Sequence, residues 1–512
     1  MKKQIINFSA SLVLIFSLGI MVQEVNAQST EKPNVIFFAV DDLNLMINPL
    51  GYHQAKTPNM DKLAESGVLF TNAHAPSSYC APSRTAIWTG LQASTTGCYT
   101  NEVFHYDYPN LATLQMAFKR GGYNNFGAGK LYHHRPGYVD LRDWDEFFGR
   151  NKEMKKGGYN TGYHGDDLPL PNPYPYSSYH RKTDQELNGG RFMEWGPIPD
   201  KDVHNLMDNQ RTDYICEVLK REHKKPFFAA LGLYIPHYPN YVPQEYWDMY
   251  DEDKIIIPDI KRDDFDDLPQ PIKKQMQNRF KIYQRLEGIG AMKEAVKAYL
   301  AAVSYADGML GKVLDALEES KYKDNTIIVF WSDHGYHLGQ KGNWGKHQTW
   351  QETTRVPFFI AGAGLPKDVK VDETVGLIDI YPTLIDLCKL TKPHEMDGQS
   401  LAYILENPAA SRDRDLFIPH HNRGTYAVVN QNWRFIHYDN DSEELYDLKN
   451  DPNEYDNLAN KEKFNDVKAR LRNVAPEFRE SATPANSLKL VLEGEETFHW
   501  VSKDGSEPQG KY

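Results

Sequence analysis

Four short apolar runs in this sequence end in polar residues that packing alone does not require. These residues are Asp41 and Asp42 after the run 34–40, Lys130, His133 and His134 after 123–128, His237 after 226–233, and Asp333 and His334 after 325–331. Buried carboxylates are costly unless a cation compensates their charge. Taken singly, such residues are common in loops and turns, but four endings of this kind together indicate one site.

The carboxylates in this set also indicate which metal the site would bind. Asp41, Asp42 and Asp333 offer hard oxygen ligands of the kind that Ca²⁺ and Mg²⁺ prefer, and His334 is a candidate fourth contributor. The sequence contains neither a Cys-x-x-Cys nor a His-x-x-x-His pair. Zinc is therefore a poorer alternative.

A separate stretch, residues 79–90, places Cys80 at the start of a predicted helix, with Pro82, Ser83 and Arg84 following. A helix N-terminus stabilises an anion through its free N–H groups and its dipole, and Arg84 lies about one turn further on. A lone cysteine in such a place is more often a small buried hydrophobic residue. The cysteine alone therefore leaves both interpretations open.

The apolar runs have the length of buried strands and alternate with helical patterns. Strands are predicted at 34–40, 123–128, 226–233, 325–331, 356–360 and 374–378, and helices at 58–66, 111–120, 208–221, 287–320 and 381–390. This alternation predicts an α/β fold with a large, mostly parallel sheet flanked by helices on both faces. Ligands bind at the carboxyl edge of such sheets. Residues 135–199 lack periodicity and are predicted to be a long irregular excursion.

Both ends of the chain differ from the middle. Lys2, Lys3, an apolar run at 10–22 and a small-residue site at 25–27 predict a signal peptide at 1–27. The catalytic domain is then expected at 28–410. Short segments rich in Tyr and Trp, with a hairpin turning at 430–432, predict a small antiparallel subdomain at 411–512. The residue directly after the cleavage site is Gln28 and not a cysteine, so a lipid anchor is not expected. No later run is apolar enough to cross a membrane. We therefore expect a periplasmic or secreted protein without a membrane anchor.

Net charge and cysteine content exclude some classes of protein. The formal charge of −12 argues against a nucleic-acid partner, because such proteins usually present a basic face. An anionic substrate would have to be held by local cations. If Cys80 is committed to chemistry, the remaining cysteines are an odd set, Cys98, Cys216 and Cys388, so a disulfide scaffold is not expected.

The run Cys-Ala-Pro-Ser-Arg at 80–84 resembles the Cys-x-Pro-Ser-Arg signature of the type I sulfatases, in which a maturation enzyme oxidises the cysteine to formylglycine. The resemblance extends from Pro33 to about Leu458. The stretch 332–346, and the spacing of His133 three residues after Lys130, are similar to the iduronate-2-sulfatase-like branch. The resemblance implies the alkaline-phosphatase/sulfatase-like fold and the function of a bacterial polysaccharide sulfatase.

The resemblance also implies a role for each residue of the site. The metal ligands would be Asp41, Asp42, residue 80, Asp333 and His334, holding Ca²⁺ or, less favoured, Mg²⁺. Sulfate binding and proton transfer would fall to Arg84, Lys130, His133, His237 and Lys346, with His134 as an alternative to His133. Residue 80, as a hydrated formylglycine, would attack sulfur; His237 would protonate the departing oxygen, and His133 would deprotonate the second hydroxyl that expels sulfate.

The substrate expected from these features is a sulfated polysaccharide or its oligosaccharides. A uronate-containing glycan such as algal ulvan or a glycosaminoglycan fits best, with Arg181 or Arg191 able to pair with a uronate carboxylate. Two alternatives remain open at this stage. One is a metal-dependent phosphatase or phosphodiesterase on the same fold, and the other is a secreted carbohydrate-binding protein with an inactive site.

Overall fold

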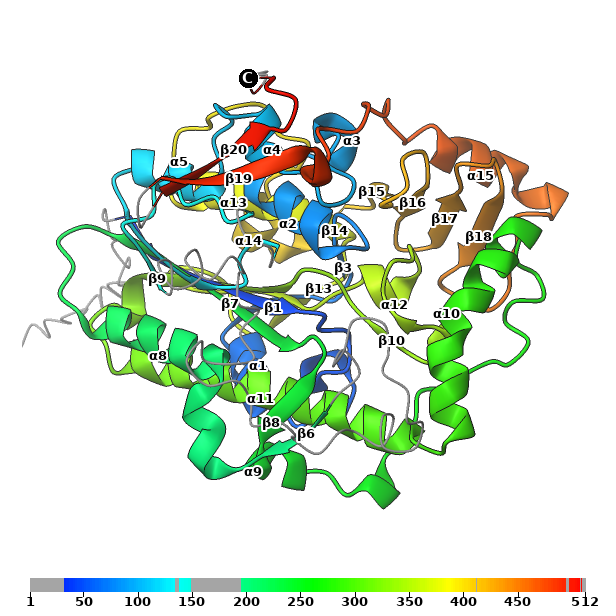
Figure 1. The fold of residues 1–512 in the computed structure, drawn as a ribbon, viewed down its shortest axis with the longest axis horizontal. Helices are drawn as coiled ribbons and strands as arrows, with labels where there is room; N and C mark the ends of the chain where they lie inside the picture. Colours follow the sequence, from blue (N-terminus) through cyan, green and yellow to red (C-terminus); the bar gives the residue numbers. More distant parts are fainter. Residues whose placement is uncertain are drawn as a thin grey trace, which may run out of the picture. The chain divides into compact units, whose positions relative to one another are not determined.

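An eight-stranded mixed sheet forms the centre of the protein (Figure 1). The computed structural model describes residues 32–133, 138–148, 195–410, 412–493, 497–506 and 508. In spatial order the strands are β13 (Val369–Val371), β2 (Gly67–Phe70), β12 (Phe358–Gly362), β9 (Thr326–Ser332), β1 (Asn34–Asp41), β7 (Phe227–Pro236), β4 (Asn124–Gly129) and β5 (Glu146–Phe148). All of these strands except β12 run in one direction. The predicted α/β fold with a mostly parallel sheet is confirmed.

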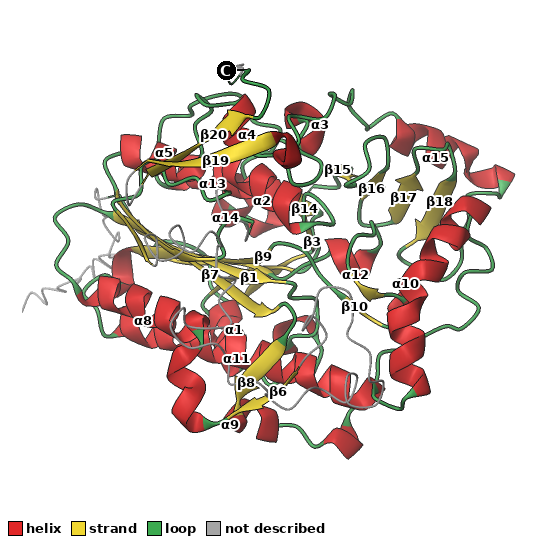
Figure 2. Ribbon diagram, viewed as in Figure 1, coloured by secondary structure: helices red, strands yellow, loops and turns green. Residues whose placement is uncertain are grey.

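Helices cover both faces of the sheet (Figure 2). One face carries α1 (Pro58–Glu65), α8 (Met207–Lys220) and α11 (Met292–Glu318), and the other carries α2 (Cys80–Thr89), α5 (Leu114–Arg120), α13 (Ile380–Leu387) and α14 (Ala402–Glu406). Strand β1 is buried along its whole length, and its alternate side chains enter the two cores. A continuous apolar run is what such a strand requires.

The four strands with polar ends are neighbours in the order β9, β1, β7, β4, all parallel, so their carboxyl ends meet at one edge. Two glycines bring β4 close to β7 at that edge. A Cβ on Gly129 would lie 2.1 Å from the Gly232 oxygen, and a Cβ on Gly232 would lie 2.3 Å from the Lys130 carbonyl. Gly129 also has a φ of +76°, which disfavours any other residue. Glycine at both positions therefore sets the place of Lys130.

Two of the predicted strands differ from the structure. The run 356–360 contributes to β12, but β12 is antiparallel to both of its neighbours. Between β9 and β12 the only α-helix in this fully described stretch is α12 (Gln351–Thr354), too short for the crossover that a parallel strand needs. The run 374–378 is not part of the main sheet, because β14 (Val375–Gly376) pairs with β3 (Ala73–His74) instead.

The helix predicted at 287–320 is confirmed as α11, and a helix that was not predicted, α10 (Gln270–Gly288), precedes it. Helix α10 ends beside Gly290, whose φ is +69°, and α11 begins at Met292. Within the predicted excursion, β5 extends the main sheet and β6 (Trp195–Ile198) pairs with β8 (Asn240–Pro243). The predicted signal peptide, His134, Arg181 and Arg191 lie outside the described residues.

A four-stranded antiparallel sheet near the C-terminus consists of β15 (Leu416–Pro419), β16 (Tyr426–Val429), β17 (Trp433–His437) and β18 (Glu443–Asp447), with α15 (Asn465–Arg472) packed against it. The predicted hairpin is β16 and β17, so the small antiparallel element is confirmed. A further hairpin joins β19 (Leu488–Glu493) to β20 (Thr497–Ser502). The residues from Lys32 onward form one compact unit, and the boundary at 410/411 stays a prediction.

The C-terminal sheet contacts the segment that follows Lys346. Arg434 of β17 donates to the Thr349 carbonyl at 2.8 Å, and the Trp350 indole donates to Glu444 of β18 at 2.8 Å. These bonds are buried, so the sheet fixes this segment relative to the main sheet. Among the described helices, none has the length and apolar content to cross a membrane, and the four cysteines, all in the described chain, are free thiols.

Candidate active site

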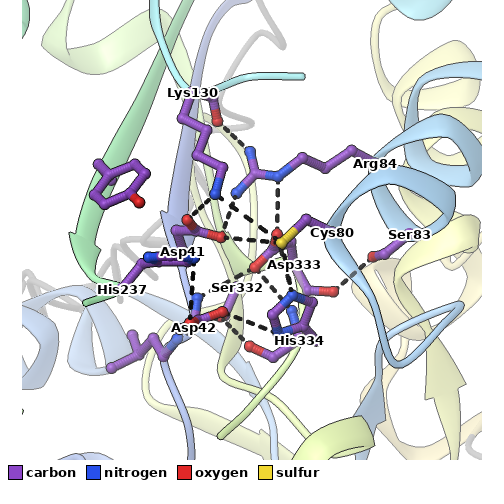
Figure 3. Close-up of polar contacts among 12 residues, drawn as sticks. Asp41, Asp42, Cys80, Ser83, Arg84, Lys130, His237, Ser332, Asp333 and His334 are labelled. Carbon is purple, nitrogen blue, oxygen red and sulfur yellow. Dashed lines mark hydrogen bonds and ion pairs between the residues drawn. The ribbon is translucent and has the colours of Figure 1, made fainter. Parts of the chain in front are cut away.

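Helix α2 brings Cys80 to the carboxyl edge of the sheet. All ten of its residues are buried, and the helix ends at Gly90, whose φ of +72° forms a left-handed cap. The Ser83 hydroxyl donates to the main-chain oxygen of Asp333 at 2.6 Å. This bond ties the first turn of α2 to the end of β9, so Cys80 faces the polar strand ends (Figure 3).

Three carboxylates meet there, those of Asp41, Asp42 and Asp333, and each is fully buried. Arg84 joins two of them, with Nε 2.8 Å from Asp333 Oδ2 and Nη2 3.3 Å from Asp41 Oδ1. Its Nη1 also donates to the Lys130 carbonyl. The guanidinium therefore holds the ends of β1, β4 and β9 together.

Two lysines complete the charge balance. Lys130 Nζ binds Asp41 Oδ2, and Lys346 Nζ lies 2.6 Å from Asp42 Oδ1 and 3.2 Å from Cys80 Sγ. Together with Arg84, the site has three cationic side chains against three carboxylates. Its formal charge is therefore close to zero when the histidines are neutral.

Asp42 has an unusual backbone, with a φ of +63°. Non-glycine residues rarely adopt this conformation, which costs about 1–3 kcal/mol unless the surroundings fix it. The Tyr299 hydroxyl donates to the Asp42 carbonyl at 2.7 Å, and the Asp42 N–H donates to Asp333 Oδ1 at 3.3 Å. Tyr299 lies in α11, more than 250 residues away, and no sequence signal pointed to it.

Three of the four histidines predicted for the site are among the described residues, and they lie in different parts of it. His334 contacts Cys80 directly, with Nε2 3.1 Å from Sγ, and its Nδ1 lies 3.3 Å from Asp42 Oδ1. His237 Nε2 lies 3.9 Å from Asp42 Oδ2, and its Nδ1 lies 2.6 Å from the Tyr238 carbonyl. His133 packs against Tyr79, with ring centroids 5.8 Å apart.

Burial and charge shift the titration of these groups. Burial raises the pKa of the Cys80 thiol to about 12, although Lys130 and Lys346 oppose the rise. Burial acts to raise the pKa of Asp41, but Lys130, His237 and Arg84 outweigh it and hold that pKa well below its usual value. Burial, reinforced by Lys346 and Lys130, holds the pKa of His237 well below its ordinary value. The unmodified thiol is therefore a poor nucleophile at neutral pH, because little of it is ionised.

Four of these residues form a group that could hold a metal ion. One ligand atom from each of Asp41, Asp42, Cys80 and His334 lies within 4.8 Å of the others. Asp42 Oδ2 is buried and has no hydrogen-bond partner among the described residues. Asp333, also a predicted ligand, lies beside this group and is bonded to Arg84 and to the N–H groups of Asp42 and His334.

Comparison with known proteins decides the family. Residues 33–390 match the sulfatase family, and residues 339–481 match the C-terminal region of N-sulphoglucosamine sulphohydrolase. A sulfatase of Formosa agariphila is 38% identical over 464 residues, covering 88% of this chain and 87% of that protein. The chain belongs to the sulfatase family. It is a sulfuric ester hydrolase, so the phosphatase and inactive-binder alternatives are set aside.

Other relatives of this sulfatase agree with the expected branch. Human iduronate 2-sulfatase is 30% identical over 420 residues, covering 71% of this chain and 70% of that protein. An ulvan-active sulfatase of Formosa agariphila is 25% identical and covers 86% of this chain and 80% of its own. The predicted resemblance is confirmed at the level of the family and its relatives.

Solved structures share the fold. A 2-O GAG sulfatase aligns with a TM-score of 0.65 at 22% identity, covering 87% of this chain and 91% of that one. The phosphonate monoester hydrolase of Agrobacterium radiobacter aligns with a TM-score of 0.67 at 20% identity, covering 92% and 100%. Because that enzyme acts on a different ester, the fold alone does not determine the reaction.

The position of Arg84 generates a prediction about stability. Replacing it in Arg84→Met leaves Asp41 and Asp333 buried without their shared cation, so we expect a loss of about 3 kcal/mol in unfolding free energy. Urea unfolding of protein dialysed against a chelator measures this loss of unfolding free energy. Arg262→Met is the matched control, because Arg262 is 78% exposed and, among the described residues, forms its ion pair with Glu287. Its loss should stay below about 0.5 kcal/mol. Equal losses in the two variants would contradict the role given to Arg84.

Proposed function

We propose that this sulfatase is an exported enzyme that removes sulfate esters from a sulfated polysaccharide or its oligosaccharides, using a formylglycine made from Cys80 and a divalent metal. The observation that carries the proposal is the placement of Cys80, at the N-terminus of a buried helix and within 3.2 Å of both His334 and Lys346. A maturation enzyme that oxidises this cysteine is the implied partner.

The side chains present fit a divalent cation. The donor set of Asp41, Asp42, residue 80 and His334 is rich in carboxylate oxygen, which suits Ca²⁺ first and Mg²⁺ second. Asp42 Oδ2, which accepts no hydrogen bond from the described residues, is a ready ligand. A near-neutral cluster would attract an anionic sulfate ester weakly, and a dication would make it positive. When bound, the metal would supply Lewis-acid polarisation of the sulfate oxygens.

The residues of the chain have separate tasks in this proposal. The formylglycine hydrate would supply one hydroxyl that attacks sulfur and a second that releases sulfate. Lys130, Lys346 and Arg84 would hold the negative charge that develops on the sulfate oxygens. His237 would protonate the departing sugar oxygen from Nε2 as the imidazolium, since Nδ1 keeps its own proton on the Tyr238 carbonyl. An anionic sulfate ester bound beside the ring would favour this charged form against the burial that lowers its pKa. Such a proton transfer is typically worth about 10²–10⁴-fold. His133 would accept the proton of the second hydroxyl.

The substrate class rests on the relatives. One is active on ulvan and others are iduronate 2-sulfatases, which favours a uronate-containing sulfated glycan. The predicted signal peptide at 1–27 favours the periplasm or the exterior as the place of action. Because the net charge of −12 opposes a polyanion, we propose action on chain ends or short oligosaccharides.

Maturation gives the first test of this function. Protein produced together with a formylglycine-generating enzyme should yield a peptide containing residue 80 about 18 Da lighter than the thiol form, since CH₂SH becomes CHO. Sulfate release should follow the modified fraction, and Cys80→Ala should abolish it. Cys216→Ala is the control, because Cys216 lies in α8. Full activity from a sample holding only the unmodified thiol would refute the mechanism.

Metal binding has a readout other than activity. Adding Ca²⁺ to chelator-treated protein at one hundred times its dissociation constant should stabilise the fold by about 2.7 kcal/mol, seen as a higher Tm. Asp42→Ala should lose this Ca²⁺-dependent rise in Tm, because it removes a carboxylate of the donor set. Asp315→Ala, an exposed change in α11, should keep it. Stoichiometric zinc in the active protein would overturn the assignment of calcium.

The substrate class is tested by rates. We expect kcat/KM to be highest for a short, uronate-containing sulfated oligosaccharide, lower for the intact polymer and lowest for para-nitrophenyl sulfate, since only the first combines a chain end with sugar contacts. The rate of sulfate release gives kcat/KM for each of the three substrates. An aryl sulfate that is the best of the three would reject the carbohydrate assignment and leave the sulfatase reaction in place.

A further inference from the structure

Three aromatic side chains lie next to the candidate active site and have no task in the chemistry above. We call Tyr79, His347 and His421 the ring cluster. The Tyr79 ring centroid lies 4.9 Å from that of His347 and 6.5 Å from that of His421, and the two imidazoles are 5.2 Å apart. Tyr79 directly precedes Cys80, and His347 directly follows Lys346. The cluster therefore adjoins the place where the sulfate ester would react.

The ring cluster is partly exposed, unlike the residues that surround Cys80. Each of its three side chains keeps some solvent exposure, whereas Cys80 is 2% and Lys346 is 6% exposed. The three members come from the start of α2, the segment after β11 (Trp344–Gly345), and the connection between β15 and β16. Rings at the exposed border of a buried reactive group are in position to contact the part of a substrate that extends outward.

The backbone of His347 is fixed from two sides. It has a φ of +79°, which is uncommon outside glycine. Its N–H donates to the Ser78 carbonyl at 3.2 Å, and its carbonyl lies 2.7 Å from His420 Nε2. His420 Nδ1 accepts from the Asn422 N–H at 3.0 Å, so the proton of this imidazole is on Nε2, which donates to His347. A strained residue held in this way is preorganised for contact with a ligand.

We propose that the ring cluster is the subsite for the sugar ring that carries the sulfate ester, an inference that rests on the proposed function. The face of Tyr79 can pack against the C–H face of a pyranose. His347 and His421 can both donate and accept hydrogen bonds, as ring hydroxyls require. A choline sulfate ester offers no free hydroxyl to the two imidazoles.

The test compares matured wild type with His347→Ala and His421→Ala. The substrates are sulfated glycosaminoglycan disaccharides, ulvan oligosaccharides, para-nitrophenyl sulfate and choline sulfate. On the sugar substrate that the wild type cleaves best, each variant should lose at least about tenfold more kcat/KM than on para-nitrophenyl sulfate, chiefly through KM. His437→Ala is the matched control, a partly buried histidine of β17 that contacts Gly424 and Tyr426, and it should change neither rate.

The remaining outcomes separate this inference from the proposed function. Equal losses on sugar and aryl substrates, or no loss on either, would overturn the subsite while the sulfatase reaction stands. A wild type that cleaves choline sulfate or para-nitrophenyl sulfate faster than every sugar would overturn it as well. A matured wild type that releases sulfate from none of the substrates would reject the proposed function, and the subsite with it.

Discussion

The buried pairing of three carboxylates with three cations is the constraint on which the rest of this structure depends. Asp41, Asp42 and Asp333 are removed from water, and a buried charge without a partner would be far more costly than any other feature of this edge. Arg84 resolves most of this cost, because one guanidinium contacts two of the carboxylates and the Lys130 carbonyl. The same contacts align three strand ends and orient the first turn of α2, so the electrostatic requirement and the geometry of the site have one origin.

Several features far along the chain position the residues of this pairing. The close approach of Gly129 to Gly232 brings Lys130 to Asp41. Tyr299 of α11 stabilises the left-handed backbone that points Asp42 into the site. The C-terminal sheet, through Arg434 and Glu444, fixes the segment that follows Lys346. A small sheet far along the chain thus helps to position a lysine next to Cys80.

The chemistry of the site, and not its architecture, identifies the reaction class. A phosphonate monoester hydrolase shares the fold with a TM-score of 0.67, and a GAG sulfatase shares it with a TM-score of 0.65. What identifies this chain as a sulfatase is the family match over 33–390, which includes the Cys-Ala-Pro-Ser-Arg run at the head of α2. The buried thiol, whose pKa is raised to about 12, would be a weak nucleophile as it stands, which agrees with a precursor that is modified before use.

Local patterns of a few adjacent residues were enough to predict the buried strands, the polar residues at their ends, the C-terminal hairpin and the motif at 80–84. How these parts combine depends on contacts that the folded chain alone brings together. The reversal of β12 depends on the missing crossover between β9 and β12. Helix α10 was not among the predicted helices. Three features of the site depend on contacts between residues far apart in the chain. They are the bond of Asp333 to Arg84, the support that Tyr299 gives to Asp42, and the contact of His421 with His347. Such contacts follow from the packing of whole elements, which no local periodicity records.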